Sequence, residues 1–141
     1  MICYFDTSAL VPLLITEPSS EVCRRLWDDA DAVVTARLAY VEAAAALGQA
    51  ARLRRVTSSA HRAARRILDQ LWLELDVVEI DDGLVRRAAE LARSHALRGY
   101  DAMHCACAEQ LLDSDLVVSA GDRDLLRACT ALGLATADVH A

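Results

Sequence analysis

The sequence opens with Met1-Ile-Cys-Tyr-Phe-Asp-Thr-Ser-Ala-Leu-Val-Pro-Leu-Leu14, and this stretch decides how the rest of the chain is interpreted. Ile2 to Phe5 is an uninterrupted apolar run, typical of a strand buried on both faces of a parallel sheet. The run ends at Asp6, and a helical turn is expected directly after it. Taken alone, an aspartate at this point is most simply a helix cap. It also lies where open parallel α/β sheets bind ligands, outside the carboxyl end of a strand.

Length and composition indicate one domain. A chain of 141 residues can bury a full core, and its 55% apolar content comes mainly from Ala, Leu and Val. No apolar run approaches the roughly 20 residues of a membrane span. The N-terminus lacks the basic start and long apolar core of a signal peptide, so we expect a cytoplasmic protein without membrane contact.

The use of cysteine and lysine excludes several kinds of site. The five cysteines lie in apolar surroundings and are expected to be reduced core thiols. His104-Cys105-Ala106-Cys107 has no second pair at ligand spacing, so it does not predict a zinc site. All 15 basic residues are arginine. Receiver domains, P-loop NTPases and Schiff-base enzymes all need a lysine, which argues against these classes.

Strand and helix patterns alternate along the chain. Strands are expected at residues 2–5, 32–35, 77–80, 116–119 and, at an edge, 134–136. Helices are expected at about 7–10, 20–29, 37–55, 58–75, 82–97, 100–112 and 123–131. The sequence therefore predicts a single α/β domain over residues 1–141, with a small, mainly parallel sheet of four or five strands flanked by helices.

A local group of arginines stands out in a protein whose net charge is −6. We call it the basic zone, and its members are Arg52, Arg54, Arg55, Arg62, Arg65 and Arg66. These side chains are either phosphate contacts or a solvated helix face with Asp and Glu partners, and the sequence leaves both interpretations open.

Four acids lie at comparable points of the pattern. Asp6 and Asp122 each end a strand and begin a helix, Asp101 opens a helix after Gly99, and Glu42 lies early in the helix after the second strand. In a right-handed wound sheet these points belong to one edge. Grouped carboxylates repel one another unless a cation offsets them. Mg²⁺, or alternatively Mn²⁺, is such a cation, and the resulting site suits phosphodiester cleavage.

The chain resembles the PIN-domain nucleases, specifically the VapC-type toxins of bacterial toxin–antitoxin pairs, over nearly its whole length. The resemblance lies in Tyr4–Leu10, Val41–Ala43, Leu97–His104 and Val118–Leu125. It implies a PIN domain at 1–141 and a Mg²⁺- or Mn²⁺-dependent endoribonuclease that cleaves RNA. It also implies a homodimer and a cognate antitoxin bound over the active site.

The resemblance carries site residues over by motif. Asp6, Glu42, Asp101 and Asp122 are then the catalytic, metal-binding acids, with Ser8 as a polar support of Asp6. The family usually has Thr or Ser two residues before its last acid.

Here Ser119 lies three residues before Asp122, and Gly121 resembles an extension of one residue. Either Asp122 or Asp124 is therefore the fourth acid. We prefer Asp122, because Asp124 would serve the helix dipole from inside the first turn. His104 is expected to be a packed or capping histidine rather than a general base.

Two other functions remain alternatives. One is a catalytically idle PIN-like module that binds RNA or protein, which the presence of all four acids disfavours. The other is a metal-dependent phosphatase that acts on small phosphoesters. Loss of nuclease activity on chelation would distinguish the nuclease from the first, and activity on a chromogenic monoester would identify the second.

Overall fold

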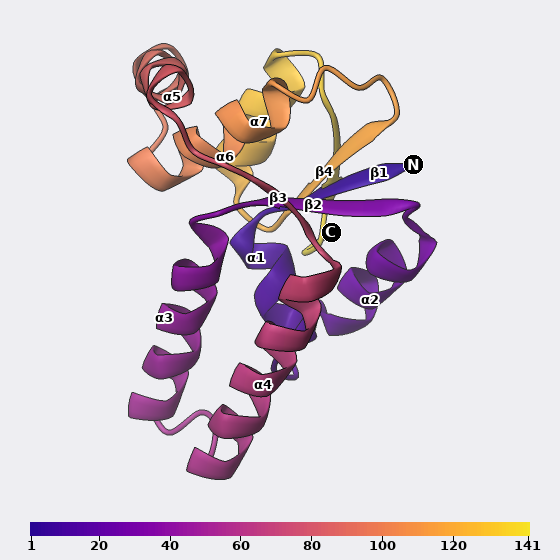
Figure 1. The fold of residues 1–141 in the computed structure, drawn as a ribbon, viewed down its shortest axis with the longest axis vertical. Helices are drawn as coiled ribbons and strands as arrows, with labels where there is room; N and C mark the ends of the chain where they lie inside the picture. The colour runs from indigo at the N-terminus through magenta and orange to yellow at the C-terminus, as the bar shows by residue number, and fades with distance from the viewer.

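A computed structural model describes all residues from 1 to 141 (Figure 1). The strands are β1 (Ile2–Phe5), β2 (Ala32–Ala36), β3 (Asp76–Val78), β4 (Leu116–Ala120) and β5 (Ala135–Asp138). The helices are α1 (Thr7–Leu10), the 3₁₀ turn η1 (Val11–Leu13), α2 (Ser20–Asp29), α3 (Ala39–Arg52), α4 (Ser58–Glu74), α5 (Asp82–Ser94), α6 (Gly99–Glu109) and α7 (Arg123–Ala131). The expected α/β class and every expected element are confirmed.

All five strands are parallel and lie in the order β3-β2-β1-β4-β5. Ile2 pairs with Ala32 on one side and with Leu116 on the other, so β1 is the central strand. From β1 the chain adds β2 and β3 in one direction, and it then returns to add β4 and β5 in the other. The winding direction therefore reverses between β1 and β4, and open α/β sheets bind ligands at the carboxyl end of such a switch point.

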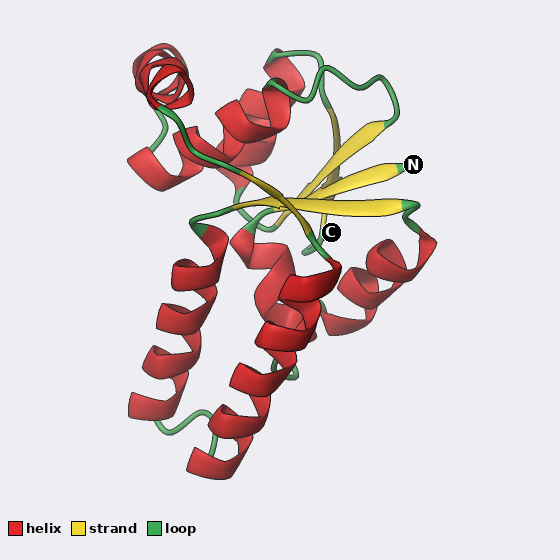
Figure 2. Cartoon of the chain, viewed as in Figure 1, coloured by secondary structure: helices red, strands yellow, loops and turns green.

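The sheet separates two layers of helices, with α5, α6 and α7 over one face and α1 to α4 over the other (Figure 2). Successive side chains of a strand point to opposite faces. Tyr4 accordingly joins the core under α5 to α7, whereas Cys3 and Phe5 join the core against α1 to α4. All five cysteines are buried, and none forms a disulfide bond, as expected. None of the helices combines the length and apolarity needed to cross a membrane.

Several helices end earlier than the sequence predicts. The expected ends near 55, 97 and 112 lie in the structure at Arg52, Ser94 and Glu109. Two or three residues past each end comes a residue with positive φ: Arg54 at 57°, Ala96 at 53° and Leu112 at 50°. A left-handed residue commonly terminates a helix, and glycine is its usual sequence signal. Because non-glycine residues take this role here, the pattern alone did not reveal where the helices stop.

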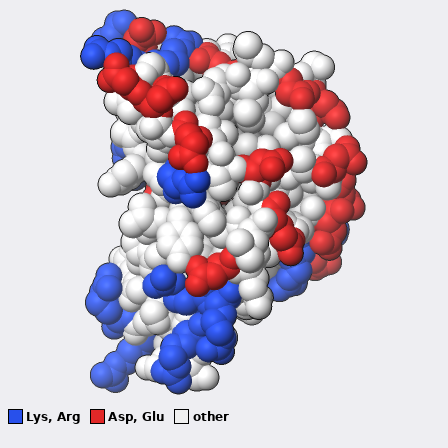
Figure 3. Space-filling view, in the orientation of Figure 1, with Lys and Arg blue, Asp and Glu red and all other residues white.

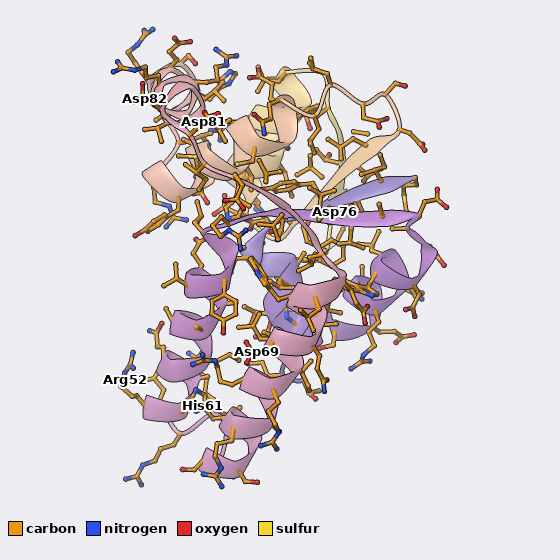
Figure 4. The ribbon with its side chains drawn as sticks, viewed as in Figure 1. Arg52, His61, Asp69, Asp76, Asp81 and Asp82 are labelled. Atoms are coloured by element: carbon orange, nitrogen blue, oxygen red, sulfur yellow. The ribbon has the colours of Figure 1, made fainter.

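Capping side chains determine where α4 and α5 begin. The Asp81 carboxylate accepts a hydrogen bond from the Leu84 amide at 2.8 Å, and Thr57 caps α4 through Ala60 N–H at 3.0 Å. Asp81 and Asp82 lie together at the start of α5, as Figure 4 shows. Strand β3 spans Asp76–Val78 rather than 77–80, because its ladder with β2 ends where Val78 pairs with Ala36.

Candidate active site

Asp6 lies at the carboxyl end of β1 and caps α1. It is buried, and its Oδ2 accepts hydrogen bonds from Ser8 Oγ at 2.5 Å and from Ser8 N–H at 3.2 Å. Ser8 Oγ in turn accepts from the Gly121 amide of the β4–α7 connection, at 2.8 Å. Ser8 thus links the ends of the two strands at the switch point. Asp6 can cap α1 and also belong to the acidic site. One carboxylate oxygen caps the helix, and the other remains available.

Gly121 is the one-residue extension noted in the sequence. The imidazole of His140 lies against its Cα, and a Cβ built there would come within 2.4 Å of His140 Nε2. A larger residue at this point would have to displace the ring of His140, which is exposed.

Glu42 reaches the same place from the first turn of α3. Its side chain is 21% exposed, and its Oε1 accepts hydrogen bonds from Thr7 Oγ1 at 2.8 Å and from His104 Nε2 at 2.6 Å. A lone Glu on an Ala-rich helix is usually a solvated surface residue, but Glu42 is partly buried. The side chain faces the edge of the sheet, where Thr7 and His104 hold it.

His104 is buried, as expected, but it lies within the acidic site rather than apart from it. Its Nε2 faces Glu42 and lies 3.4 Å from Asp6 Oδ1, and its Nδ1 is 2.7 Å from the hydroxyl of Tyr4. Burial acts to lower the pKa of His104. The hydrogen bond to Glu42 and the charges of Asp6, Glu42 and Asp101 outweigh burial, and the pKa is raised above its ordinary value.

Asp101 and Asp122 approach from the starts of α6 and α7, and Arg98 bridges them. Arg98 Nε donates to Asp101 Oδ2 at 3.1 Å, and its Nη2 donates to Asp122 Oδ2 at 3.0 Å. Burial raises the pKa of Asp101; Arg98 opposes that effect, while the charges of Asp122 and Asp6 add to it. Asp6 and Asp122 are thus close enough to Asp101 to act on its carboxyl group.

Asp124 does not enter this cluster. Its side chain is 62% exposed and pairs with Arg127 one turn along α7, at 2.7 Å. Asp122 instead caps α7 by accepting from the Leu125 amide at 3.0 Å, which leaves Asp122 Oδ2 facing Arg98. Of the two candidates for the fourth acid, only Asp122 lies beside the other three.

The donor set of the cluster fits a hard divalent cation. Asp6 Oδ1, Glu42 Oε2 and Asp101 Oδ1 accept no hydrogen bond from the protein, whereas the partner oxygen of each carboxylate is anchored. Three oxygens that carry negative charge and lack donors are what Mg²⁺ or Mn²⁺ binds. In the conformation described, no three such side chains are close enough to share one ion. Arg98 supplies the compensating charge between two of them.

The four acids line none of the hollows of the molecule. The largest hollow of the molecule, about 600 Å³, lies elsewhere, between η1 and α4, and is lined mainly by apolar side chains with Arg24 and Arg55. The four carboxylate side chains are 7% to 23% exposed, so each is only partly accessible to solvent at the edge of the sheet.

The basic zone lies at the far end of the α3–α4 hairpin, the lower end in Figure 3. Figure 4 shows Arg52 and His61 on the two arms near that end. None of the six arginines takes part in an ion pair, although most other arginines do. The sequence left open that these arginines pair with Asp and Glu on a solvated helix face. The structure shows no such acidic partners.

Sequence reasoning did not assign Thr7, Arg98, His104 or Tyr4 to the site. Arg98 and His104 flank Asp101 at three residues on either side, and residues three apart share a helix face. Tyr4 and Asp6 are two apart, which puts both on one side of β1. The spacing was visible in the sequence, but it did not show that the two faces meet.

Residues 3–130 match the family model described as the PIN domain. The chain therefore belongs to the PIN-domain family, and the resemblance to VapC-type proteins is confirmed. It is 44% identical over 130 residues to "Ribonuclease VapC49" of Mycobacterium tuberculosis H37Rv, covering 92% of this chain and 90% of the relative.

Solved structures share the fold. PAE2754 from Pyrobaculum aerophilum has a TM-score of 0.73 at 25% identity, covering 99% of this chain and 90% of that one. A chain of a toxin–antitoxin complex from Klebsiella pneumoniae has a TM-score of 0.62 at 15% identity, covering 86% and 88%.

Proposed function

We propose that this protein is a Mg²⁺- or Mn²⁺-dependent endoribonuclease toxin of the VapC type. One observation carries the proposal: four acids from separate segments meet at the switch point of a PIN fold, and three of them keep an oxygen free of hydrogen bonds. The ribonuclease name of a relative with 44% identity supports RNA as the substrate.

In this proposal Asp6, Glu42, Asp101 and Asp122 hold the cation. When bound, it would lower the pKa of a water molecule and neutralise charge on the scissile phosphate. Ser8 orients Asp6, and Thr7 orients Glu42. The reaction is hydrolysis of a phosphodiester bond.

Arg98 has to leave the Asp101–Asp122 pair before a cation can take its place. Its side chain is 80% exposed, so it can turn into solvent at small cost, since exposed ion pairs contribute little free energy. From that position the guanidinium can donate to an RNA phosphate, for which its planar fork is suited.

The partners proposed are RNA, a cognate antitoxin and a second copy of this chain. The resemblance to VapC-type toxins implies all three, and the fold shared with a chain of a toxin–antitoxin complex agrees with the antitoxin. A toxin that cleaves transcripts would act in the cytoplasm.

The test is cleavage of a 5′-labelled single-stranded RNA by the purified protein in Mg²⁺, in Mn²⁺ and in chelator, with Asp6→Asn as the inactive control. Cleavage that needs the metal and is lost in Asp6→Asn is expected. Binding without cleavage would instead identify an idle binding module. Hydrolysis of p-nitrophenyl phosphate by a protein that does not cleave RNA would identify a phosphatase. Either of these two results would overturn the proposal.

A further inference from the structure

Tyr4 and His104 form a buried polar pair directly behind the acidic site. Tyr4 is fully buried and His104 is 1% exposed, yet neither side chain is an ordinary core residue. A buried hydroxyl or imidazole nitrogen costs free energy unless it is hydrogen-bonded. The contact of 2.7 Å between Tyr4 Oη and His104 Nδ1 satisfies both groups at once.

The contacts of the two ring nitrogens fit one tautomer of the neutral imidazole, because the Glu42 carboxylate can only accept and therefore requires the hydrogen on Nε2. When the Tyr4 hydroxyl donates to Nδ1, the hydrogen of the ring lies on Nε2 and points at Glu42 Oε1, 2.6 Å away. At many metal sites the hydrogen bond made by one ring nitrogen of a histidine likewise sets the role of the other nitrogen. The chain of donors therefore runs from β1 through α6 to α3.

The result is a Glu42 carboxylate with one fixed oxygen. Oε1 accepts from Thr7 Oγ1 and from His104 Nε2, whereas Oε2 accepts nothing from the protein. Two donors from different elements, α1 and α6, restrict rotation of the carboxylate group. Asp6 has the same arrangement, since Ser8 holds its Oδ2 by two hydrogen bonds.

We propose that Tyr4 and His104 are positioning residues that hold Glu42 in the orientation needed to bind the divalent cation. The proposal rests on the function proposed above, because it takes Glu42 to be a ligand. It assigns no proton transfer to His104. Tyr4 acts through His104, and His104 acts through Glu42.

Four variants test it. Tyr4→Phe removes only the buried hydroxyl, and His104→Leu removes both nitrogens. His104→Gln keeps an N–H at about the reach of Nε2, so it should retain part of the function. Tyr40→Phe is the matched control, because the Tyr40 hydroxyl also donates a short hydrogen bond, to Asp69 at 2.6 Å, away from the acids.

Mn²⁺ binding is measured by calorimetry, and kcat and KM are measured on RNA. Tyr4→Phe and His104→Leu should each weaken Mn²⁺ binding by about 10-fold or more and lower kcat by a similar factor, with KM nearly unchanged. His104→Gln should lie between His104→Leu and the wild type, and Tyr40→Phe should match the wild type. A purely structural role would lower the melting temperature without this order of Mn²⁺ affinities.

The ¹⁵N spectrum of the histidine ring, recorded where the ring is neutral, is the independent readout. It should show His104 protonated at Nε2 in the wild type, and a shifted Nδ1 resonance in Tyr4→Phe, where the hydrogen bond to Nδ1 is lost. Mn²⁺ affinity unchanged in Tyr4→Phe and His104→Leu, or a wild-type ring protonated at Nδ1, would overturn the positioning role. A wild type that binds Mn²⁺ but leaves RNA intact would overturn the proposed function alone, because the Mn²⁺ series still decides the positioning role.

Discussion

At the scale of single residues, three of the acids have one carboxylate oxygen hydrogen-bonded to the protein and one that accepts no hydrogen bond from it. Ser8 anchors one oxygen of Asp6, Arg98 one of Asp101, and Thr7 with His104 one of Glu42. An ordinary helix cap needs only the anchored oxygen. Arg98 bridges Asp101 and Asp122, and His104 lies beside Asp6 and Glu42; this grouping distinguishes the four acids from a coincidental set of caps.

The first prediction concerns the acids as one unit. Asp6→Asn, Glu42→Gln, Asp101→Asn and Asp122→Asn should each reduce RNA cleavage by at least about tenfold, because residues that act together are not lost in graded steps. Asp124→Asn should stay within about twofold of the wild type, since that side chain is turned toward Arg127. Initial cleavage rates at saturating Mg²⁺ provide the measurement. Loss of activity in Asp124→Asn with near-normal Asp122→Asn would reverse the choice of fourth acid.

The second prediction concerns the charge on Asp101. Its pKa is raised by burial and by neighbouring carboxylates, so the ionised group destabilises the metal-free fold. Asp101→Asn should therefore melt higher in chelator, by about 3 °C for about 1 kcal/mol in a domain of this size. It should also reduce the extra stabilisation by Mn²⁺. Thermal melts with Asp124→Asn as control decide the matter, and a less stable mutant with an undiminished Mn²⁺ shift would contradict the four-acid site.

At the scale of elements, the position of α6 matters most, because it carries both Asp101 and His104. Its far end is held to α5 by Arg87, whose Nε and Nη2 donate to the two oxygens of Glu109, each at 2.7 Å. Such a two-pronged contact fixes orientation as well as distance. The hydrogen bonds from Arg87 lower the pKa of Glu109 below its ordinary value, against the opposing effect of burial.

The third prediction follows from that depressed pKa. A group whose pKa is lower in the folded state stabilises the fold above its unfolded pKa, here 4.5, and loses this effect as the pH falls through its folded pKa. Glu109→Gln should therefore melt about 3 °C below the wild type at pH 7, for roughly 1 kcal/mol. The difference in melting temperature between the two proteins should disappear below pH 4.5. Glu21→Gln, which removes an exposed pair on α2, is the control, and a difference independent of pH would exclude the ion pair as its cause.

At the scale of the whole molecule, the acids and the basic zone lie apart, which would let a protein of net charge −6 bind the proposed RNA substrate. The acids lie at the carboxyl edge of the sheet, and the basic zone lies at the end of the α3–α4 hairpin, as Figure 3 shows for that end. Arginines without acidic partners are free to contact phosphates. RNA held at the hairpin could then pass along the molecule to the edge that carries the acids.

The fourth prediction concerns this surface. Arg62 and Arg66 are exposed and one turn apart on α4, so Arg62→Ala with Arg66→Ala should weaken RNA binding. The slope of log affinity against log salt should fall by about one unit, since each phosphate contact on a single strand contributes roughly 0.7. Fluorescence anisotropy in chelator measures binding without cleavage.

The control removes two arginines that already have partners, Arg86 and Arg127, which pair with Asp82 and Asp124. If the salt slope is unchanged in the α4 variant, or is reduced equally in the control, the basic zone is an ordinary solvated surface.

Much of this fold was predictable because it depends on local pattern. The buried run from Ile2 to Phe5, the alternation of strands and helices and the capping aspartates are written in neighbouring residues, and a parallel wound sheet follows from them. The four acids could be grouped for the same reason, since strand ends of such a sheet meet at one edge. The helix ends before Arg54, Ala96 and Leu112 escaped prediction, because left-handed residues other than glycine leave no mark in the sequence.

The sequence by itself thus determined the class of fold, the family and the four candidate acids. Only the tertiary structure decided that Glu42 faces inward, that Asp122 rather than Asp124 joins the group, and that Arg98, His104 and Tyr4 belong to the site. These points depend on contacts between residues up to 100 positions apart, such as that of Tyr4 with His104. Periodicity gives the face of each element, but the meeting of two faces is set by how the elements pack together.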